Sequence, residues 1–215
     1  MRYLATFMML YICFPAQGQY NPRKYHDFDD VKTMAYNKDL NQYTTIELNT
    51  RDDCAKGNII GGILHIRNDC DEAIYTTMDM PVLYKGNFEI VVVVKIFCGE
   101  THDLLRDGYI SWAVEGSSYT YNTFAFTNDK YYGFHSRNGK TGVCSNKLYS
   151  KRDVYYYNDF ARYTIRKYGD KYYFFINGRL IGTAPYLETD GKLFELGASA
   201  KAYTEYKYIA MYYLP

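Results

Sequence analysis

The sequence has no marked excess of charge of either sign and few long hydrophobic runs. Its 215 residues carry 25 basic and 24 acidic side chains, which gives a net charge of +1. Because nucleic-acid binding depends on a basic face that neutralises phosphates, this balance argues against nucleic acid as a principal partner. Beyond the N-terminus, the apolar stretch from Ile90 to Phe97 is too short for a membrane helix and contains Lys95. We therefore expect no membrane span.

Signatures of several enzyme and metal-site classes are also missing. There is no GxSxG, GxGxxG or P-loop pattern, so neither a nucleophile elbow nor a phosphate cradle is indicated. The histidines and cysteines show no spacing typical of zinc ligands. Two acid-rich runs, Asp27–Asp30 and Asp69–Glu72, offer the oxygen ligands that Ca²⁺ prefers, although each is also typical of a turn. We expect no cofactor, with calcium at either run as the alternative.

The first 18 residues resemble a secretory signal peptide. Arg2 supplies a positive charge, an apolar stretch from Leu4 to Phe14 follows, and Ala16 and Gly18 are small residues suited to cleavage before Gln19. A lipoprotein signal at Cys13 is the alternative. Cleavage removes Arg2 and leaves 24 basic and 24 acidic residues. We expect a secreted, periplasmic or cell-surface protein, with an extension over residues 19–42 and one domain over residues 43–215.

Four cysteines remain after removal of Cys13, an even number that suits an oxidising compartment. If Gly61-Gly62 is a two-residue hairpin turn, Cys54 lies opposite residue 69, one position from Cys70. We therefore predict a Cys54–Cys70 disulfide and, by elimination, a second disulfide that joins Cys98 to Cys144.

Short strands with tight turns between them are expected throughout the chain. Residues 163–185 show two-residue alternation, a break at Gly169-Asp170, and then Asn177-Gly178, the strongest short signal for a type I′ hairpin. Candidate strands recur at even spacing from residue 43 to residue 214, with one short helix near Asp29–Tyr36. This spacing, with little 3.6-residue periodicity, predicts an all-β protein built as a two-sheet antiparallel sandwich.

The same stretch resembles the concanavalin A-like lectin/glucanase superfamily, in particular its LamG-like jelly rolls. The resemblance rests on TIRK at 164–167, DKYY at 170–173, ING at 176–178 and Leu180-Ile181, followed by FELG at 194–197 and YIAMYY at 208–213. Upstream, residues 61–66 and 87–97 are similar to an early and a long central strand of that family. The resemblance implies a jelly roll over about residues 27–214, in a superfamily of lectins, glycosidases and protein-binding modules.

Glycosidases of this superfamily place their carboxylates on one strand, in a pattern like Glu-x-Asp-x-x-Glu, which this sequence lacks. The nearest acids, Glu100 and Asp103, have the wrong spacing. We therefore expect a protein that is not an enzyme and that binds carbohydrate or an extracellular protein. The alternatives are a structural or protein-interaction domain, and a glycoside hydrolase with an atypical carboxylate arrangement.

A candidate ligand surface lies on the middle strands. Alternation places Tyr131, His135 and Arg137 on one side of their strand, with Gly133 between them leaving room for a ligand. Trp112, the single tryptophan, is on a strand expected to neighbour this one. We predict that Trp112, Tyr131, His135 and Arg137 bind the ligand. A core position for Trp112, between the two sheets, is the competing interpretation.

Overall fold

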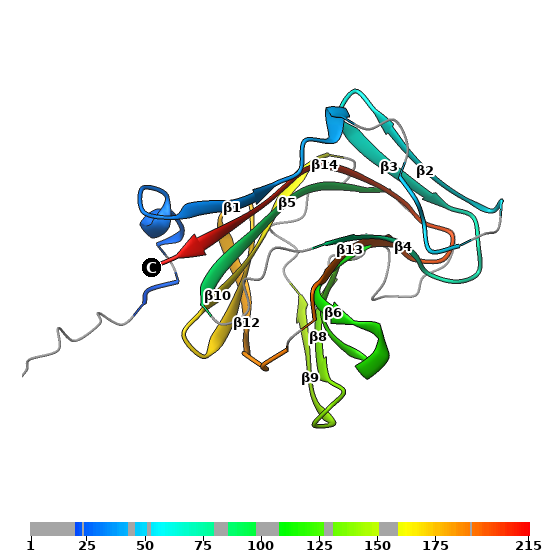
Figure 1. Cartoon of the computed structure of the whole chain (residues 1–215). Helices are drawn as coiled ribbons and strands as arrows, with labels where there is room; N and C mark the ends of the chain where they lie inside the picture. Colours follow the sequence, from blue (N-terminus) through cyan, green and yellow to red (C-terminus); the bar gives the residue numbers. More distant parts are fainter. Residues whose placement is uncertain are drawn as a thin grey trace, which may run out of the picture.

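A computed structural model describes residues 20–22, 24–42, 46–50, 53–79, 86–97, 108–126, 131–150, 159–189 and 191–215. The expected signal peptide lies outside these residues. The described chain forms two antiparallel sheets packed face to face, and the larger sheet arches over the smaller one (Figure 1). This arrangement confirms the predicted all-β sandwich.

The larger sheet has eight strands in the order β12-β11-β10-β5-β14-β3-β2, with β1 paired to β14. Its strands are β1 (Thr33–Asn37), β2 (Ala55–Ile60), β3 (Ile63–Asn68), β5 (Asn87–Phe97), β10 (Ala161–Tyr168), β11 (Lys171–Ile176), β12 (Arg179–Pro185) and β14 (Tyr203–Leu214).

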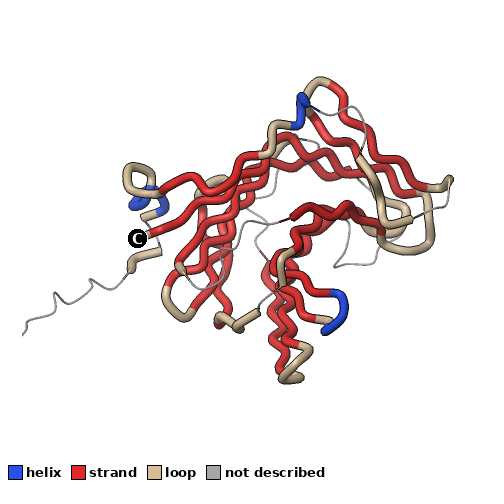
Figure 2. The backbone as a smooth tube through the Cα atoms, viewed as in Figure 1, coloured by secondary structure: helices blue, strands red, loops and turns tan. Residues whose placement is uncertain are grey.

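The smaller sheet has six strands in the order β4-β13-β6-β7-β8-β9. They are β4 (Ile74–Asp79), β6 (Gly108–Glu115), β7 (Thr120–Phe126), β8 (Tyr131–Asn138), β9 (Val143–Ser150) and β13 (Leu193–Ala198). Strands dominate the described chain, and loops and short helical turns join them (Figure 2).

Three short 3₁₀ turns, and no α-helix, occur among the described residues: η1 (Tyr25–Phe28), η2 (Leu40–Gln42) and η3 (Gly116–Ser118). The helix predicted near Asp29–Tyr36 is therefore wrong, because β1 occupies much of that stretch and pairs with the long strand β14. The strand predicted over 43–49 is not formed at its described residues 46–49. No helix in the described ranges combines the length and the apolar character needed to cross a membrane.

The core lies between the sheets and is rich in aromatic rings. Trp112 of β6 is fully buried there, with its ring centroid 5.5 Å from that of Tyr172 on the opposite sheet. Tyr206 of β14 also crosses the core, since its hydroxyl donates to the carbonyl of Gly197 on β13 at 2.7 Å. A buried tyrosine needs such a partner for its hydroxyl, so these contacts hold the sheets in register as well as filling space.

The glycine hairpin between β2 and β3 forms as predicted. Gly61 and Gly62 both have positive φ, at 57° and 73°, and Ile60 lies opposite Ile63. The amide of Asp69 donates to the carbonyl of Cys54 at 2.8 Å, so Cys54 lies opposite residue 69 and its disulfide with Cys70 is formed.

The second predicted disulfide is not found. Cys144 is a free, exposed cysteine on β9 of the smaller sheet, opposite Arg137. Cys98 lies outside the described residues, and Phe97, which precedes it, ends β5 in the other sheet. Pairing by elimination assumed that every cysteine left after export is oxidised, and the exposed free thiol of Cys144 contradicts that assumption.

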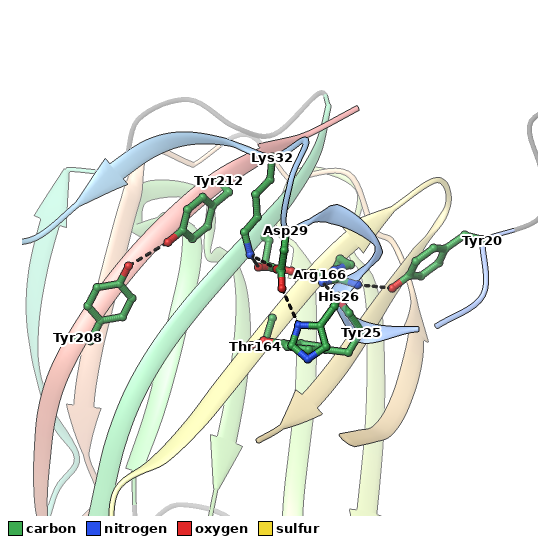
Figure 3. Close-up of polar contacts among 10 residues, drawn as sticks. Tyr20, Tyr25, His26, Asp29, Lys32, Thr164, Arg166, Tyr208 and Tyr212 are labelled. Carbon is green, nitrogen blue, oxygen red and sulfur yellow. Dashed lines mark hydrogen bonds and ion pairs between the residues drawn. The ribbon is translucent and has the colours of Figure 1, made fainter. Parts of the chain in front are cut away.

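The N-terminal segment covers the outer face of the larger sheet, where it encloses an ion pair (Figure 3). The side chains of Arg166 on β10 and Glu89 on β5 are fully buried, and Arg166 Nε donates to Glu89 Oε2 at 2.8 Å. Arg166 also donates to the carbonyl of Tyr25 at 2.9 Å, and its guanidinium lies 4.9 Å from the Phe28 ring centroid. Lys32 Nζ lies 3.1 Å from Glu89 Oε1. The segment therefore supplies both the cover and part of the hydrogen bonding that a buried charge pair requires.

Candidate functional site

A groove of about 820 Å³ lies on the outer face of the smaller sheet, on the side away from the core. Side chains alternate along each strand, so the groove is lined by alternate residues of β4, β13, β7, β8 and β9 and by residues of β6 on either side of an irregularity in that strand. The main lining residues are Tyr75, Tyr109, Ser111, Val114, Tyr121, Thr123, Gly133, His135, Asn146 and Glu195.

Strand register brings polar groups from five strands, β13, β6, β7, β8 and β9, into one row across the floor. Glu195 of β13 pairs with Thr77 on one side and with Ser111 on the other. Ser111 pairs with Thr123, which in turn pairs with His135. The row ends at Asn146 on β9. Residues far apart in the sequence thus form a line of hydrogen-bonding side chains about one strand spacing apart.

Two contacts fix the side chains of this row. The hydroxyls of Ser111 and Thr123 lie 2.9 Å apart, within hydrogen-bond distance. The Tyr121 hydroxyl lies 3.1 Å from His135 Nδ1, and the two rings meet edge to face. Tyr121 and His135 are each partly exposed, so their outer surfaces remain open to a ligand.

A β-bulge in β6 decides which acidic group faces the groove. Ala113 has a left-handed backbone with φ at 53°, and the register with β7 shifts between Trp112 and Glu115. Val114 consequently lines the groove, whereas Glu115 pairs with Thr120, a buried residue on the core side. Strict alternation from Ser111 would have put Glu115 in the groove.

Glu195 is the one carboxylate among the described lining residues, and it is half-buried. Its side chain has no hydrogen-bond or ion-pair partner within the described parts of the chain. Burial without a compensating charge disfavours the ionised form and raises the pKa of Glu195 to about 7. A carboxyl group with that pKa can hold or release a proton near neutral pH, which is a property of general acids and bases.

The structure places the predicted ligand residues at different positions relative to the groove. His135 lines the groove as expected, beside Gly133. Arg137 lies on the same face but is exposed beyond the lining, with its guanidinium 5.8 Å from the Tyr119 ring centroid. Tyr131 pairs with Ser150 through the backbone, and its side chain lies outside the described residues.

Trp112 does not belong to the site. Its side chain points into the core and has no exposed surface, so the prediction that it binds the ligand is wrong and the competing core position is correct. Its strand, β6, is also separated from β8 by β7. Sequence alternation alone does not identify the buried face of a strand. Aromatic residues occur on both faces of these strands, so hydrophobicity did not distinguish the core face from the outer face.

The sequence also failed to single out Glu195 and the tyrosines of the groove. Alternation of Phe194 and Leu196 with Glu195 and Gly197 was a usable signal, because it placed the carboxylate on the face opposite two apolar residues. The neighbours of Glu195 depend on register across strands that are distant in sequence.

The acid-rich runs considered for calcium contact basic side chains. Asp29 contacts His26 and Lys32, and Asp69 contacts Arg67. Within the described residues no group of three or more metal-ligating side chains gathers. The expectation of no cofactor, with calcium at either run as the alternative, stays a prediction.

The chain matches no known protein-family model. It also matches no curated protein in sequence. Several solved structures share its fold. The catalytic domain of an endo-1,3-β-glucanase (laminarinase) from Thermotoga petrophila RKU-1 is 12% identical with a TM-score of 0.57, over 85% of this chain and 98% of that one. A non-specific endo-β-1,3(4)-glucanase of family GH16 is 10% identical with a TM-score of 0.60, over 86% and 92%.

A third similar structure is the CBM2 module of the evolved Dit protein from Lactobacillus casei BL23 phage J-1. It is 13% identical with a TM-score of 0.55, over 85% of this chain and 96% of that one. At these identities the likeness establishes the fold.

The expectation that the chain is not an enzyme is corrected by these findings. Catalytic glucanases are among the structures that the chain matches over most of its length. That expectation rested on a missing single-strand motif, whereas the row of polar groups in the groove comes from five different strands, so the missing motif does not exclude catalysis. The chain has the concanavalin A-like jelly-roll β-sandwich fold that its sequence resembles.

Proposed function

We propose that the groove on the outer face of the smaller sheet binds carbohydrate. The observation that carries the proposal is the row Glu195–Ser111–Thr123–His135–Asn146, which lies in an open groove together with three partly exposed tyrosines. The similarity to glucanases and to a CBM2 module supports it.

The chemistry of the groove suits a sugar chain. The rings of Tyr75, Tyr109 and Tyr121 offer apolar faces against which the C–H faces of pyranose rings can stack. Hydroxyl, imidazole, amide and carboxyl groups in one row provide donors and acceptors for sugar hydroxyls. A largely apolar concave surface with a few well-placed polar groups is the usual composition of a small-ligand site.

A glycan-binding assay with variants tests this proposal. Tyr121→Ala removes a ring and the partner of His135, and we expect it to weaken binding to an array of neutral glycans at least tenfold. Tyr213→Ala is the matched control, because Tyr213 is an exposed tyrosine of the larger sheet. Equal binding by both variants, or no binding by the native protein to any glycan with or without calcium, would refute the proposal.

A second candidate function, cleavage of a glycosidic bond, is favoured by Glu195. A carboxyl group with a pKa near 7 is suited to protonate the leaving oxygen of a glycoside. Retaining and inverting mechanisms both need a second group, usually another carboxylate. Catalysis in this groove therefore predicts that Glu195→Gln stops the release of reducing sugar while glycan binding is kept. Sugar release that is unchanged in Glu195→Gln would place the reaction elsewhere.

We further infer that the protein is exported. The Cys54–Cys70 disulfide supports this, because disulfides persist in oxidising compartments. Cell fractionation followed by N-terminal sequencing tests it, with Gln19 expected as the first residue of the exported chain. Recovery of the full chain in the cytosol with both thiols reduced would contradict it.

A further inference from the structure

A second groove, of about 570 Å³, lies on the outer face of the larger sheet, at the end formed by β2, β3 and β14. The two grooves are on different sheets, so one ligand cannot fill both. The second groove is lined by basic, polar and acidic side chains together with the aromatic ring of Tyr203 and the aliphatic side chain of Ile60. The charged and polar residues are Lys56, Asn58, His65, Arg67, Asp69 and Lys201.

Aromatic rings from three neighbouring strands stack across this surface. The Tyr203 ring is stacked on Phe97 at 4.6 Å between centroids and lies nearly parallel to His65 at 6.1 Å. The Tyr203 hydroxyl donates to Glu205 Oε1 at 2.8 Å and lies 2.6 Å from His65 Nδ1. These contacts fix the orientation of the Tyr203 ring before any ligand binds, which lowers the entropy cost of stacking a ligand on it.

The basic side chains beside these stacked rings have exposed hydrogen-bond donors that a ligand can reach. Lys56 and Arg67 are opposite one another on β2 and β3, and Arg67 is in turn opposite Tyr203. Among the described residues Arg67 contacts Asp69 through Nε, at 2.8 Å, and its side chain is 67% exposed. The exposed ammonium of Lys56 has no partner within the described chain. Lys201 contacts Asp71 at 3.0 Å and donates to the carbonyl of Asp69.

We propose that this surface is a second saccharide site, for a sugar unit that carries a carboxylate or a sulfate. The sugar ring would stack on Tyr203 and its anionic group would lie on the paired Lys56 and Arg67 side chains. The guanidinium fork matches a planar carboxylate or the oxygens of a sulfate.

The acidic neighbours favour a single anionic group over a polyanion. Asp69 contacts Arg67, Asp71 contacts Lys201, and Glu205 lies beside Tyr203, so these carboxylates repel a backbone that carries a charge on every unit. A nucleic acid of regular phosphate spacing is therefore disfavoured, in agreement with the balanced charge of the chain.

Isothermal titration of the native protein with three probes tests the proposal: a cellotetraose with one unit oxidised to glucuronic acid, a cellotetraose with one sulfate ester, and uncharged cellotetraose. We expect one or both acidic probes to bind, with an affinity that falls as NaCl is raised from about 0.05 to 0.5 M. The double variant Lys56→Ala/Arg67→Ala should lose at least about tenfold in affinity, which corresponds to the loss of one charge-assisted contact. The carboxylate and sulfate arms identify which anion is preferred.

Lys171→Ala is the matched control, because Lys171 is an exposed lysine of the same sheet outside this groove. Tyr203→Ala should also abolish binding of the acidic probe, and the fluorescence of buried Trp112 checks that each variant is folded. The proposal fails if neither acidic probe binds, if the double variant binds as the native protein does, or if a single-stranded DNA oligonucleotide binds as tightly as the acidic probes. Tyr121→Ala should leave this binding unchanged, so its result is independent of the first groove.

Discussion

At the residue scale, the groove carboxyl of Glu195 makes stability depend on pH. Its pKa is raised from 4.5 to about 7 by burial. Below pH 4.5 it is protonated in both the folded and the unfolded chain. As the pH rises toward 7, the unfolded chain loses this proton and the folded chain keeps it. The contribution of Glu195 to the free energy of unfolding therefore falls through that window. Full desolvation would make the fall about 3 kcal/mol, and solvent screening of the half-buried carboxyl reduces it to about 2 kcal/mol.

The variant Glu195→Gln should remove this fall. Urea denaturation at pH 4 and pH 8, followed by the fluorescence of Trp112, measures the difference between variant and native protein. We expect the free energy of unfolding of Glu195→Gln, minus that of the native protein, to be larger at pH 8 than at pH 4. If the free energies of unfolding of the two proteins change equally with pH, the pKa of Glu195 is not raised by folding.

A second residue-scale prediction concerns the buried ion pair on the opposite sheet. Glu89→Gln leaves the Arg166 charge buried without a counter-charge, since both side chains are fully buried. Removal of one partner of such a pair costs about 3–5 kcal/mol of stability. The control is Glu188→Gln, at an exposed glutamate, which should change stability by less than about 0.5 kcal/mol. Equal urea midpoints for the two variants would contradict the prediction.

At the scale of elements, the β2–β3 hairpin is closed by its disulfide. Cys54 and Cys70 are 16 residues apart, and closing a loop of that length restricts the unfolded chain by about 3 kcal/mol in the chain-entropy account. The double variant Cys54→Ala/Cys70→Ala should lower the free energy of unfolding by about that amount. Cys144→Ala, at an exposed free cysteine, should leave it unchanged. If dithiothreitol does not destabilise the native protein, the disulfide has no such role.

The hairpin turns could be predicted from local sequence, whereas the bulge in β6 could not. Asn177 and Gly178 both adopt positive φ, at 48° and 78°, as their type I′ pattern predicts. The bulge in β6 had no comparable signal, because it places a positive φ at Ala113, a residue that rarely adopts one. The bulge turns Glu115 out of the groove.

At the scale of the whole molecule, the N-terminal segment is part of the folded structure. Tyr25 and Phe28 are buried against the larger sheet, above Arg166. A chain that begins at Val31 should expose this ion pair and the apolar surface around it, and should lose about 3 kcal/mol or more, because two large aromatic side chains are no longer buried. Urea denaturation checks the loss. A truncated chain of native stability would show that the segment only rests on the surface.

The sequence by itself determined the strand character, the tight turns, the Cys54–Cys70 pairing and the sandwich class. All of these depend on residues close together in the chain, where alternation and turn chemistry act. The tertiary structure decided that Trp112 is core, that Cys144 is not paired, and that Glu195, Ser111, Thr123 and His135 form one row. These outcomes depend on which strands become neighbours and which face of each is covered, and contacts between distant segments set both.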